Sequence, residues 1–416
     1  MTTSQSTAAD LSPVQFFDIA IVGAGMVGAT LACALADSGL KILLLDAQAP
    51  APFAADQPHD LRVSALSPAS QTLLKKMGAW VGVEQRRLCP YRRMRVWETR
   101  GRGDTLFDCA DIDQPVLGHI VENRVLQLAL WERIEQCDSI QIHCPGLISQ
   151  LDYKPERSRL SCQDGALFEC SLLVAADGGD SWVRQQVGIG VHNWSYPQQA
   201  LVASVQTAAS QQDITWQRFV ASGPQAFLPL SGPRGSVVWY NTPTEIKRLN
   251  GLSDELFLAE LVASFPRELG AIEALQGRAS FLLRSQYALQ YSKPGVALVG
   301  DAAHMIHPLA GQGVNIGLLD AAQLAEEIGL ALSAGENWAS QEVLHRYQKA
   351  RQQHNLMMMA SMDLFCRGFS NNSAPLKLIR NLGLGMAQRI TPLRHQAMKL
   401  AMGLTGSLPE LARKPL

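Results

Sequence analysis

The 416-residue sequence has almost no net charge, no paired cysteines and no long apolar run. Its formal net charge is −1, so the composition gives no reason to expect nucleic acid as a partner. Its eight cysteines form no C-x-x-C pair and no His/Cys cluster with metal-ligand spacing. They indicate buried thiols in a reducing compartment rather than a disulfide framework, and we predict no metal site.

Membrane-spanning, secretory and common hydrolase signals are also missing. No window approaches 18 uninterrupted apolar residues, so we expect no transmembrane helix. The opening stretch MTTSQSTAADLSPVQ has no lysine, no arginine and no apolar core, which is unlike a signal peptide. We therefore expect a cytoplasmic protein. The absence of H-E-x-x-H and G-x-S-x-G argues against a zinc protease and an α/β-hydrolase.

What the sequence does contain is a strand–turn–helix–strand unit near its start. The apolar residues 19–22 predict a strand, residues 26–38 predict a helix that stops at Gly39, and residues 42–45 predict a second strand. The second strand ends on Asp46. This order is the context in which a glycine-rich turn binds a dinucleotide.

The turn itself reads G-x-G-x-x-G, with glycines at Gly23, Gly25 and Gly28. Gly23 suits the tight turn, Gly25 allows a pyrophosphate to approach the backbone, and Gly28 lets the helix lie close to the sheet. Asp46 is placed to receive a ribose hydroxyl. The alternative is a purely structural βαβ turn. We find no second turn of this type, so a nicotinamide cofactor has no domain of its own here.

Two later apolar strands end in similar turns. Residues 172–176 run into Asp177, and residues 296–299 run into Gly300 and Asp301. Ligands of open α/β sheets bind at the carboxyl ends of the strands, so we expect the three turns to meet at one edge. A long cofactor that needs contacts from the beginning, middle and late chain fits FAD better than NAD.

Three motifs carry a resemblance to a known family. The segments GAGMVG, AADGGDSWVR and GDAAHMIHPLAGQGVN, in this order and spacing, resemble those of the class A flavoprotein aromatic hydroxylases. The segments APFAADQPHDLRVSALSPAS, CPYRRMRVWE, LGHIVEN, GPQAFLPL and FSNNSAPLKLIRNLGL are similar to the bacterial ubiquinone-biosynthesis branch of that family. The resemblance covers essentially the whole chain, and demethoxyubiquinol is the substrate that it favours.

This resemblance implies an α/β fold in which a Rossmann-like FAD-binding domain carries an inserted, mostly antiparallel β substrate domain and a C-terminal helical region. The domain boundaries that we predict are 14–80, 107–182 and 282–330 for the FAD-binding domain, 81–106 and 183–281 for the substrate domain, and 331–416 for basic amphipathic helices.

The late motif suggests how the flavin ring is approached. By resemblance, Asp301 holds the ribityl chain and the loop 308–313 runs along the isoalloxazine. Gly311 and Gly313 allow main chain to lie close to a flat ring, and the helix that follows directs its positive end toward it. Asn315 has a short amide that can bond ring or loop atoms. Gly300 completes the turn before Asp301.

Other candidates in the cofactor region rest on the resemblance alone. Arg62 is expected near the flavin phosphates or ring, with a surface salt bridge as the alternative. Arg124 is expected near the pyrophosphate, with a solvated helix face as the alternative. Asp177 is expected to face the cofactor rather than to act as a base.

Two histidines and a proline in the late motif invite a catalytic role. We expect His304 to bond the loop backbone. His307 and Pro308 are the catalytic candidates, because a histidine titrates where proton traffic requires it and the adjacent proline loop closes the pocket.

Residues 183–280 contain short runs rich in β-branched and aromatic residues, separated by glycine and proline, as in an antiparallel sheet. We predict that such a sheet walls a cavity opposite the flavin, with Phe227, Leu228 and Trp239 as lining residues. The alternative is that these side chains belong to an ordinary core.

Basic residues and a helical apolar stripe characterise the C-terminal region. No acidic residue lies between Asp363 and Glu410, whereas this stretch contains several lysines and arginines. The pattern suits an anionic membrane surface or a partner groove. The alternative is that these helices pack on the catalytic domain.

The mechanism that the resemblance implies is ring hydroxylation. NADH or NADPH transiently reduces FAD, O2 adds to give a C4a-hydroperoxyflavin, and its distal oxygen passes to the ring of a polyprenylated quinol or phenol. The alternatives are a hydroxylase of another ring position in the pathway, an FAD-dependent quinone or isoprenoid reductase, and an FAD-holding scaffold. Expected partners are the membrane-derived quinol, O2, a ubiquinone-biosynthesis complex and a second copy of the chain, at the inner face of the cytoplasmic membrane.

Overall fold

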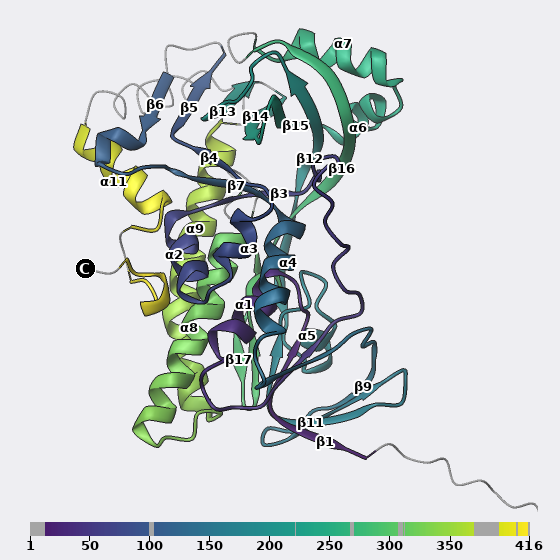
Figure 1. The fold of residues 1–416 in the computed structure, drawn as a ribbon, viewed down its shortest axis with the longest axis vertical. Helices are drawn as coiled ribbons and strands as arrows, with labels where there is room; N and C mark the ends of the chain where they lie inside the picture. Colours follow the sequence, from purple (N-terminus) through teal and green to yellow (C-terminus); the bar gives the residue numbers. More distant parts are fainter. Residues whose placement is uncertain are drawn as a thin grey trace, which may run out of the picture.

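The computed structural model describes residues 13–99, 104–220, 222–266, 270–306, 311, 313–369, 391–404 and 407–414. Two large β-sheets lie one above the other along the long axis of the molecule, and helices pack against each of them (Figure 1).

The lower sheet contains the strands of the predicted dinucleotide-binding unit. Its main path runs in the order β17-β18-β11-β1-β2-β8, with β10 and β9 added at β11. The pairs β18–β11, β11–β1, β1–β2 and β2–β8 are parallel. Its strands are β1 (Gln15–Val22), β2 (Ile42–Leu45), β8 (Ile140–His143), β9 (Ile148–Asp152), β10 (Ser158–Cys162), β11 (Leu167–Ala175), β17 (Ser292–Lys293) and β18 (Val296–Leu298).

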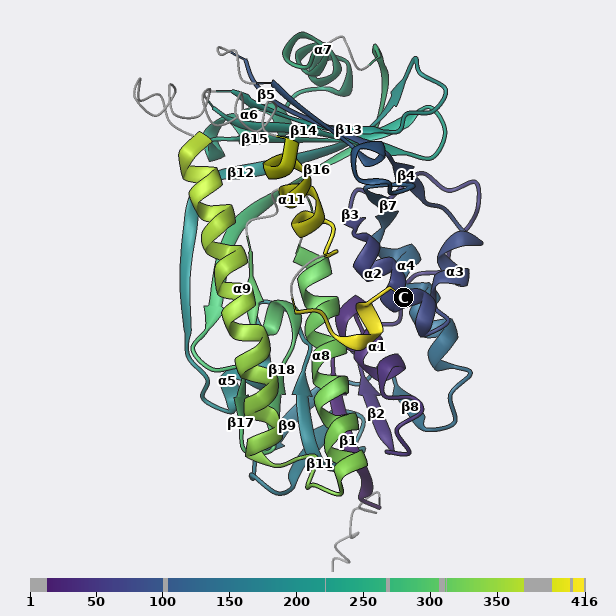
Figure 2. The ribbon, with the colours of Figure 1, turned by 90° about the vertical axis from the view of Figure 1, so that its left-hand side faces the viewer.

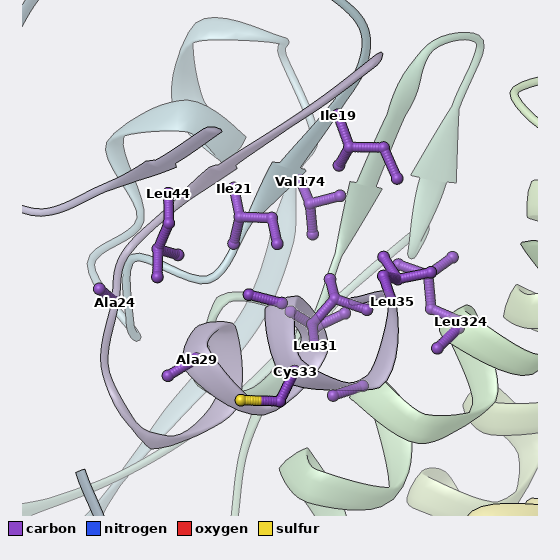
Figure 3. Packing of buried hydrophobic residues seen from close by; sticks show 14 of the residues in the cluster. Ile19, Ile21, Ala24, Ala29, Leu31, Cys33, Leu35, Leu44, Val174 and Leu324 are labelled. Carbon is purple, nitrogen blue, oxygen red and sulfur yellow. The ribbon is translucent and has the colours of Figure 1, made fainter. Parts of the chain in front are cut away.

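Helices α1, α4 and α8 pack together against this sheet, and its continuous apolar strands are buried. Side chains of β1 and β11, including Ile19, Ile21 and Val174, point toward Leu31 and Leu35 in and beside α1, and all are at most 1% exposed (Figure 3). The helices of this unit are α1 (Met26–Ala34), α4 (Asn123–Ile134), α5 (Trp182–Gln186) and α8 (Gly313–Ala334), with the 3₁₀ turn η3 (Gly300–Ala302).

The upper sheet is antiparallel except where β13 pairs with β5. Its order is β19-β16-β12-β15-β14-β13-β5-β6. The strands are β5 (Arg93–Glu98), β6 (Asp104–Asp108), β12 (Val191–Thr207), β13 (Ile214–Val220), β14 (Gly223–Leu230), β15 (Arg234–Asn241), β16 (Ile272–Ala288) and β19 (His304–Met305). Helices α6 (Pro243–Asn250) and α7 (Asp254–Ser264) cover its outer face.

A small third sheet and several helices join the two units. The small sheet has the order β3-β7-β4, and α9 runs upward from the lower unit beside α8 to the level of the upper sheet (Figure 2). These elements are β3 (Val63–Leu66), β4 (Cys89–Tyr91), β7 (Gly118–Glu122), α2 (Pro68–Lys76), α3 (Trp80–Glu84), α9 (Gln341–Phe369), α11 (Thr391–Ala401), η1 (Cys109–Ile112) and η5 (Glu410–Ala412).

The predicted fold class is confirmed, with differences at element ends. Helix α1 ends at Ala34 rather than at residue 38, because Ala36 and Ser38 donate to carbonyls three residues back and tighten the chain toward Gly39, which has a positive φ of 77°. The predicted domain boundaries at 106/107 and 281/282 fall inside β6 and β16.

Candidate cofactor and substrate site

The first glycine turn is fixed by close backbone packing. A Cβ at Gly23, where φ is +103°, would lie 2.4 Å from the carbonyl oxygen of Ala176, at the end of β11. A Cβ at Gly28 would lie 1.9 Å from the carbonyl oxygen of Gly23. The first and second predicted turns are therefore in direct contact, as the parallel register of β1 and β11 requires.

The same turn leaves room and free amides for an anion. A Cβ at Gly25 would meet nothing within 4 Å, and Gly25 caps α1 without any side-chain hydrogen bond. The first amides of α1 therefore lack a capping acceptor, and the helix dipole favours negative charge there. An open backbone beside uncapped helix amides is the cradle that a pyrophosphate needs, so this turn fits FAD.

Asp46 is bound to the glycine turn. Its Oδ2 accepts from the amide of Ala24 at 2.7 Å, and its Oδ1 accepts from the amide of Gln48 at 3.1 Å. On the other side, Gln127 Nε2 and Trp131 Nε1 of α4 both donate to the carbonyl oxygen of Ala24, at 3.0 and 2.9 Å. Sequence reasoning missed these two supports, because nothing in the sequence near α4 indicates which loop it faces.

The second and third turns lie on the neighbouring strands. Asp177 Oδ2 accepts from the amide of Val183 at 3.0 Å, while its buried Oδ1 has no hydrogen-bond partner among the described residues. Gly300 has φ of +60° and begins η3. Asp301 is an exposed residue, yet surrounding protein desolvates its carboxyl and raises its pKa, against the opposing influence of His304 and Arg62. Within the described part of the chain, Asp177 Oδ1 is thus left for a ligand.

Behind the third turn lies a cluster of buried charged and polar side chains. Asp320 Oδ2 accepts from the amide of Gly300 at 3.2 Å and bonds His304 Nε2, while its Oδ1 accepts from Arg351 Nε at 2.8 Å and from Asn355 Nδ2 at 3.0 Å. All four of these side chains are at most 2% exposed. Burial opposes ionisation of Asp320, but His304 and Arg351 outweigh it and lower the pKa of that carboxyl.

This cluster corrects the expectation for His304, which bonds a carboxylate on α8 and not the loop backbone. A signal was present in the sequence: Asp320 interrupts the apolar pattern of a long helix, and a buried acid requires a partner. The identity of the partner Arg351, on the next helix, was not readable from spacing.

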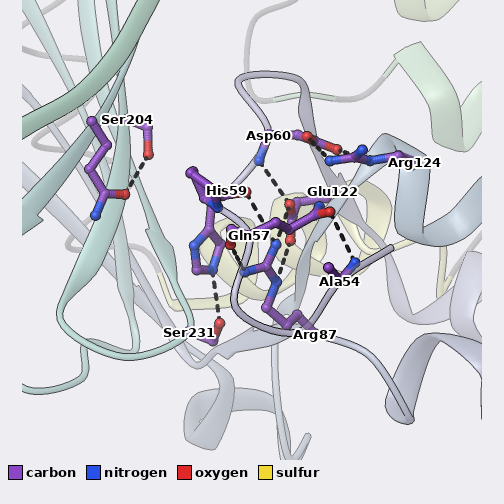
Figure 4. Close-up of polar contacts among 11 residues, drawn as sticks. Ala54, Gln57, His59, Asp60, Arg87, Glu122, Arg124, Ser204 and Ser231 are labelled. Atoms are coloured by element: carbon purple, nitrogen blue, oxygen red, sulfur yellow. Dashed lines mark hydrogen bonds and ion pairs between the residues drawn. The ribbon is translucent and has the colours of Figure 1, made fainter. Parts of the chain in front are cut away.

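The two arginine candidates have different surroundings. Arg124, on α4, forms an ion pair with Asp60, and its Nε–Oδ2 distance is 2.8 Å (Figure 4). Arg62 instead lies over the ring of Phe281, 5.2 Å from its centroid, and lines the cavity described below. Arg124 is thus held at the edge of the site by a carboxylate that sequence reasoning missed, whereas Arg62 lies between the two large sheets.

The segment before Arg62 is tied down by a second ion pair. Arg87 Nε lies 3.0 Å from Glu122 Oε2, and Glu122 Oε1 accepts from the amide of Asp60 at 2.8 Å (Figure 4). Desolvation raises the pKa of the Glu122 carboxyl, and the charge of Arg87 partly offsets this increase. Nearby, His59 bonds Ser231 at 2.9 Å, and burial lowers its pKa to about 4. These contacts connect the FAD-binding unit to the β14–β15 turn.

The start of α8 is bonded to β3 and to the start of α2 through Asn315. Asn315 is buried: its Oδ1 accepts from the Ser67 amide at 2.9 Å, and its Nδ2 donates to the Ala65 carbonyl at 2.8 Å. Its amide therefore fixes β3 and α2 to α8, in keeping with the loop-bonding alternative. A Cβ at Gly311, where φ is +63°, would lie 3.2 Å from the Ala65 amide nitrogen, and Gly313 begins α8.

The two catalytic candidates, His307 and Pro308, lie outside the described residues. Their catalytic roles remain proposals.

A cavity of about 260 Å³ lies between the inner face of the upper sheet and the chain at Arg62, Asn123 and Gly311. Arg62, Asn123 and Gly311 line its lower side. Side chains on the inner face of the upper sheet line the rest, together with Leu61 and Val63: Ala200, Val202, Gln217, Ala226, Leu228, Ser236, Val238, Tyr240, Phe281, Leu282 and Leu283. Most of this wall is apolar, which suits an aromatic ligand.

Strand alternation decides which predicted lining residues reach this cavity. Leu228 lines it. Phe227 and Trp239 do not, which corrects the expectation for them: they point to the opposite face and pack with Phe257 of α7 in a separate core cluster. Successive side chains of a strand point to opposite faces, and the sequence did not show which face α6 and α7 cover.

Comparisons with known proteins agree with this geometry. The model of a family described as "FAD binding domain" matches residues 17–361. The chain is 46% identical over 387 residues to 3-demethoxyubiquinol 3-hydroxylase of Escherichia coli (strain K12), covering 93% of this chain and 98% of that protein. It is 33% identical over 435 residues to the mitochondrial ubiquinone biosynthesis monooxygenase COQ6 of Homo sapiens, covering 92% of each chain.

Solved structures share the fold at lower identity. PqsL of Pseudomonas aeruginosa, described as a probable FAD-dependent monooxygenase, gives a TM-score of 0.75 at 21% identity, covering 89% of this chain and 100% of that one. The p-nitrophenol 4-monooxygenase PnpA of Pseudomonas putida DLL-E4 gives 0.74 at 16% identity, covering 94% and 99%. The chain therefore belongs to the FAD-binding-domain family and is an FAD-dependent monooxygenase of the branch that contains the ubiquinone-biosynthesis hydroxylases.

Proposed function

We propose that this enzyme hydroxylates the aromatic ring of a polyprenylated quinol in ubiquinone biosynthesis, with 3-demethoxyubiquinol as the substrate. The observation that carries this proposal is the mostly apolar cavity between the FAD-binding turns and the upper sheet, in a chain 46% identical to a protein named for that reaction. No cation lies among the described lining residues on the sheet side, so the wall opposite Arg62 suits an uncharged ring.

When bound, FAD supplies the redox chemistry that activates O2, and we propose NADH or NADPH as the transient electron donor. The chain's own residues do the rest. The turns at Gly25, Asp46, Asp177 and Asp301 hold the cofactor, and the apolar cavity wall keeps water away from the ring that reacts. Arg62 places a positive charge at the cavity, where it favours a substrate hydroxyl that is losing its proton.

The volume of the cavity indicates which part of the substrate it can enclose. A volume of about 260 Å³ is below the roughly 300–1,000 Å³ of pockets that enclose a whole drug-sized ligand. It accommodates a substituted ring but not a long prenyl chain. Leu282 lines the cavity and is 64% exposed, so the cavity opens to the surface beside it. We propose that the tail leaves there.

A substrate of this kind requires access to a lipid phase. Within the described part of the chain, no helix has the length and apolarity to cross a membrane. We propose peripheral attachment at the cytoplasmic face, in keeping with exposed apolar side chains such as Leu282, Leu289 and Met357. At least one basic residue of α11 contacts the rest of the protein, because Arg394 forms an ion pair with Asp111 at 3.1 Å. The basic residues between positions 370 and 390 lie outside the described part of the chain. A biosynthetic complex and a homo-oligomer also remain proposals.

The test is to supply the purified enzyme with NAD(P)H, ¹⁸O2 and demethoxyubiquinol carrying a short prenyl tail. We expect one labelled oxygen in the product ring. Reduction of the quinone without label would support the reductase alternative, and a different position of the label would support another hydroxylase of the pathway. Deleting the gene should lead to accumulation of the same demethoxy intermediate in the cell.

A further inference from the structure

Two polar side chains on the inner face of the upper sheet have no hydrogen-bond partner among the residues that the structure describes. Ser236 of β15 is 1% exposed, and its Oγ has no hydrogen-bond partner among the described residues. Gln217 of β13 is 5% exposed, and no hydrogen bond of its side-chain amide is found in the described ranges. Both line the cavity.

The cross-strand neighbours of Gln217 and Ser236 are apolar, so the two polar side chains stand in an apolar wall. Gln217 pairs across the sheet with Ala226, which pairs with Val238, and Ser236 pairs with Leu228. These three partners are apolar and line the same cavity. A buried hydroxyl or amide without a partner costs free energy, and such groups in native proteins are nearly always bonded. The surrounding wall is apolar, so the two polar groups indicate a polar ligand.

The chemistry of the two groups defines the ligand. A serine hydroxyl and a glutamine amide each donate and accept, and neither carries charge. They therefore complement the hydroxyl and methoxy oxygens of a neutral ring, whereas a ring carboxylate calls for a cation. Among the described lining residues the one cation is Arg62, on the lower side, and the sheet side has no lysine, arginine or histidine.

We propose that Ser236 and Gln217 are the specificity residues that bind the ring oxygens of the substrate, and so set which ring position is presented to the cofactor. This inference rests on the proposed function, because it takes the cavity to be the site of the quinol ring. It adds the residues that distinguish an oxygen-substituted ring from an oxygen-free ring of the same shape.

The chain offers a matched control. Ser204 of β12 lies directly across the strand pair from Ser236 and is 2% exposed, but its Oγ donates to Gln276 Oε1 at 3.4 Å (Figure 4). Ser204 is not among the cavity-lining residues. The variants Ser236→Ala, Gln217→Leu and Ser204→Ala thus compare unpartnered cavity groups with a partnered group of the same kind.

The experiment uses the FAD-loaded enzyme and two ring probes of similar shape, para-methoxyphenol and para-ethyltoluene. Binding is followed by the change in the flavin absorption spectrum, and thermal unfolding is measured in parallel. We expect wild type to prefer the methoxyphenol, and Ser236→Ala and Gln217→Leu each to weaken its binding by roughly tenfold with little effect on the hydrocarbon. Neither variant should lower the melting temperature, since no internal hydrogen bond is lost, whereas Ser204→Ala should lower it and bind both probes normally.

The outcomes separate the two proposals. If wild type hydroxylates the quinol but Ser236→Ala and Gln217→Leu bind both probes as wild type does, the specificity role is refuted and the proposed function stands. A lower melting temperature in both variants, with unchanged preference, would assign the two side chains a structural role instead. If wild type neither binds the methoxyphenol nor hydroxylates the quinol, both proposals fail.

Discussion

Replacement of Asp320 by asparagine is the perturbation that the structure predicts most sharply. Asparagine keeps the shape of the side chain but replaces one acceptor oxygen by a donor, and it removes the charge opposite Arg351, which is 1% exposed. Removing one partner of a buried ion pair costs about 3–5 kcal/mol. Total stabilities are typically about 5–15 kcal/mol, so the loss is large.

The assay is urea unfolding at pH 7 without added FAD, followed by an FAD titration of the folded variant. We expect a fall of about 3–5 kcal/mol in the free energy of unfolding. FAD should also bind more weakly, because the Gly300 amide loses its acceptor. Asp301→Asn is the control: its side chain is accessible to solvent, so FAD affinity should fall while unfolding changes by less than about 1 kcal/mol.

The pH dependence follows from the direction of the pKa shift. The pKa of Asp320 is lower in the folded than in the unfolded state, so its ionised form stabilises the fold above the unfolded value of about 3.9. That contribution is lost as the pH falls below this value toward the folded pKa. The gap in stability between wild type and Asp320→Asn should therefore narrow below about pH 4. A variant as stable as wild type at pH 7 would refute the role assigned to the cluster.

Three further predictions concern the cofactor turn and the cavity. Gly28→Ala should lower the free energy of unfolding by about 1–3 kcal/mol and release FAD, because its Cβ would lie 1.9 Å from a backbone oxygen; normal FAD content on purification would contradict this. Phe227→Ala should lower the free energy of unfolding by about 3–5 kcal/mol, because Phe227 belongs to the core under α7. Leu228→Ala should chiefly raise KM for the quinol, because Leu228 lines the cavity. The reverse pattern would contradict the sheet faces assigned to these two residues. Arg62→Ala should lower kcat/KM at least tenfold, which corresponds to about 1.4 kcal/mol of transition-state stabilisation. Its free energy of unfolding should fall by only about 0.5–1 kcal/mol, which is typical of an exposed cation–π contact. An unchanged kcat/KM would exclude a role of Arg62 at the cavity.

The sequence was sufficient to predict the cofactor-binding unit. Glycine spacing and strand ends are local properties, and parallel strands bring their carboxyl ends together, so Gly23, Asp177 and Asp301 could be assigned to one sheet edge before the structure was known. The helix after Gly25 was placed correctly at its start, where the turn fixes it. Its end was not, because a tightening turn before Gly39 has no distinct residue pattern.

The cavity was less accessible to sequence reasoning. Whether an even- or an odd-numbered residue of a strand faces the cavity depends on which face the helices α6 and α7 cover, and that is a tertiary property. Phe227 and Leu228 are adjacent and both apolar, so the sequence could not show which of them faces the cavity. The ion pair of Arg124 with Asp60 was equally hidden, because the two residues are 64 positions apart.

The central claim is that turns from three distant parts of the chain hold one FAD. Its most direct test is a calorimetric FAD titration of the apoprotein, beside the variant Gly25→Val, whose side chain would enter space with no protein atom within 4 Å of its Cβ. We expect one FAD per wild-type chain, and a valine variant that unfolds at the wild-type temperature but binds FAD at least a hundredfold more weakly (~2.7 kcal/mol at 1.36 kcal/mol per tenfold). A folded wild-type chain that takes up no FAD, or a valine variant that binds it as tightly as wild type, would contradict the account.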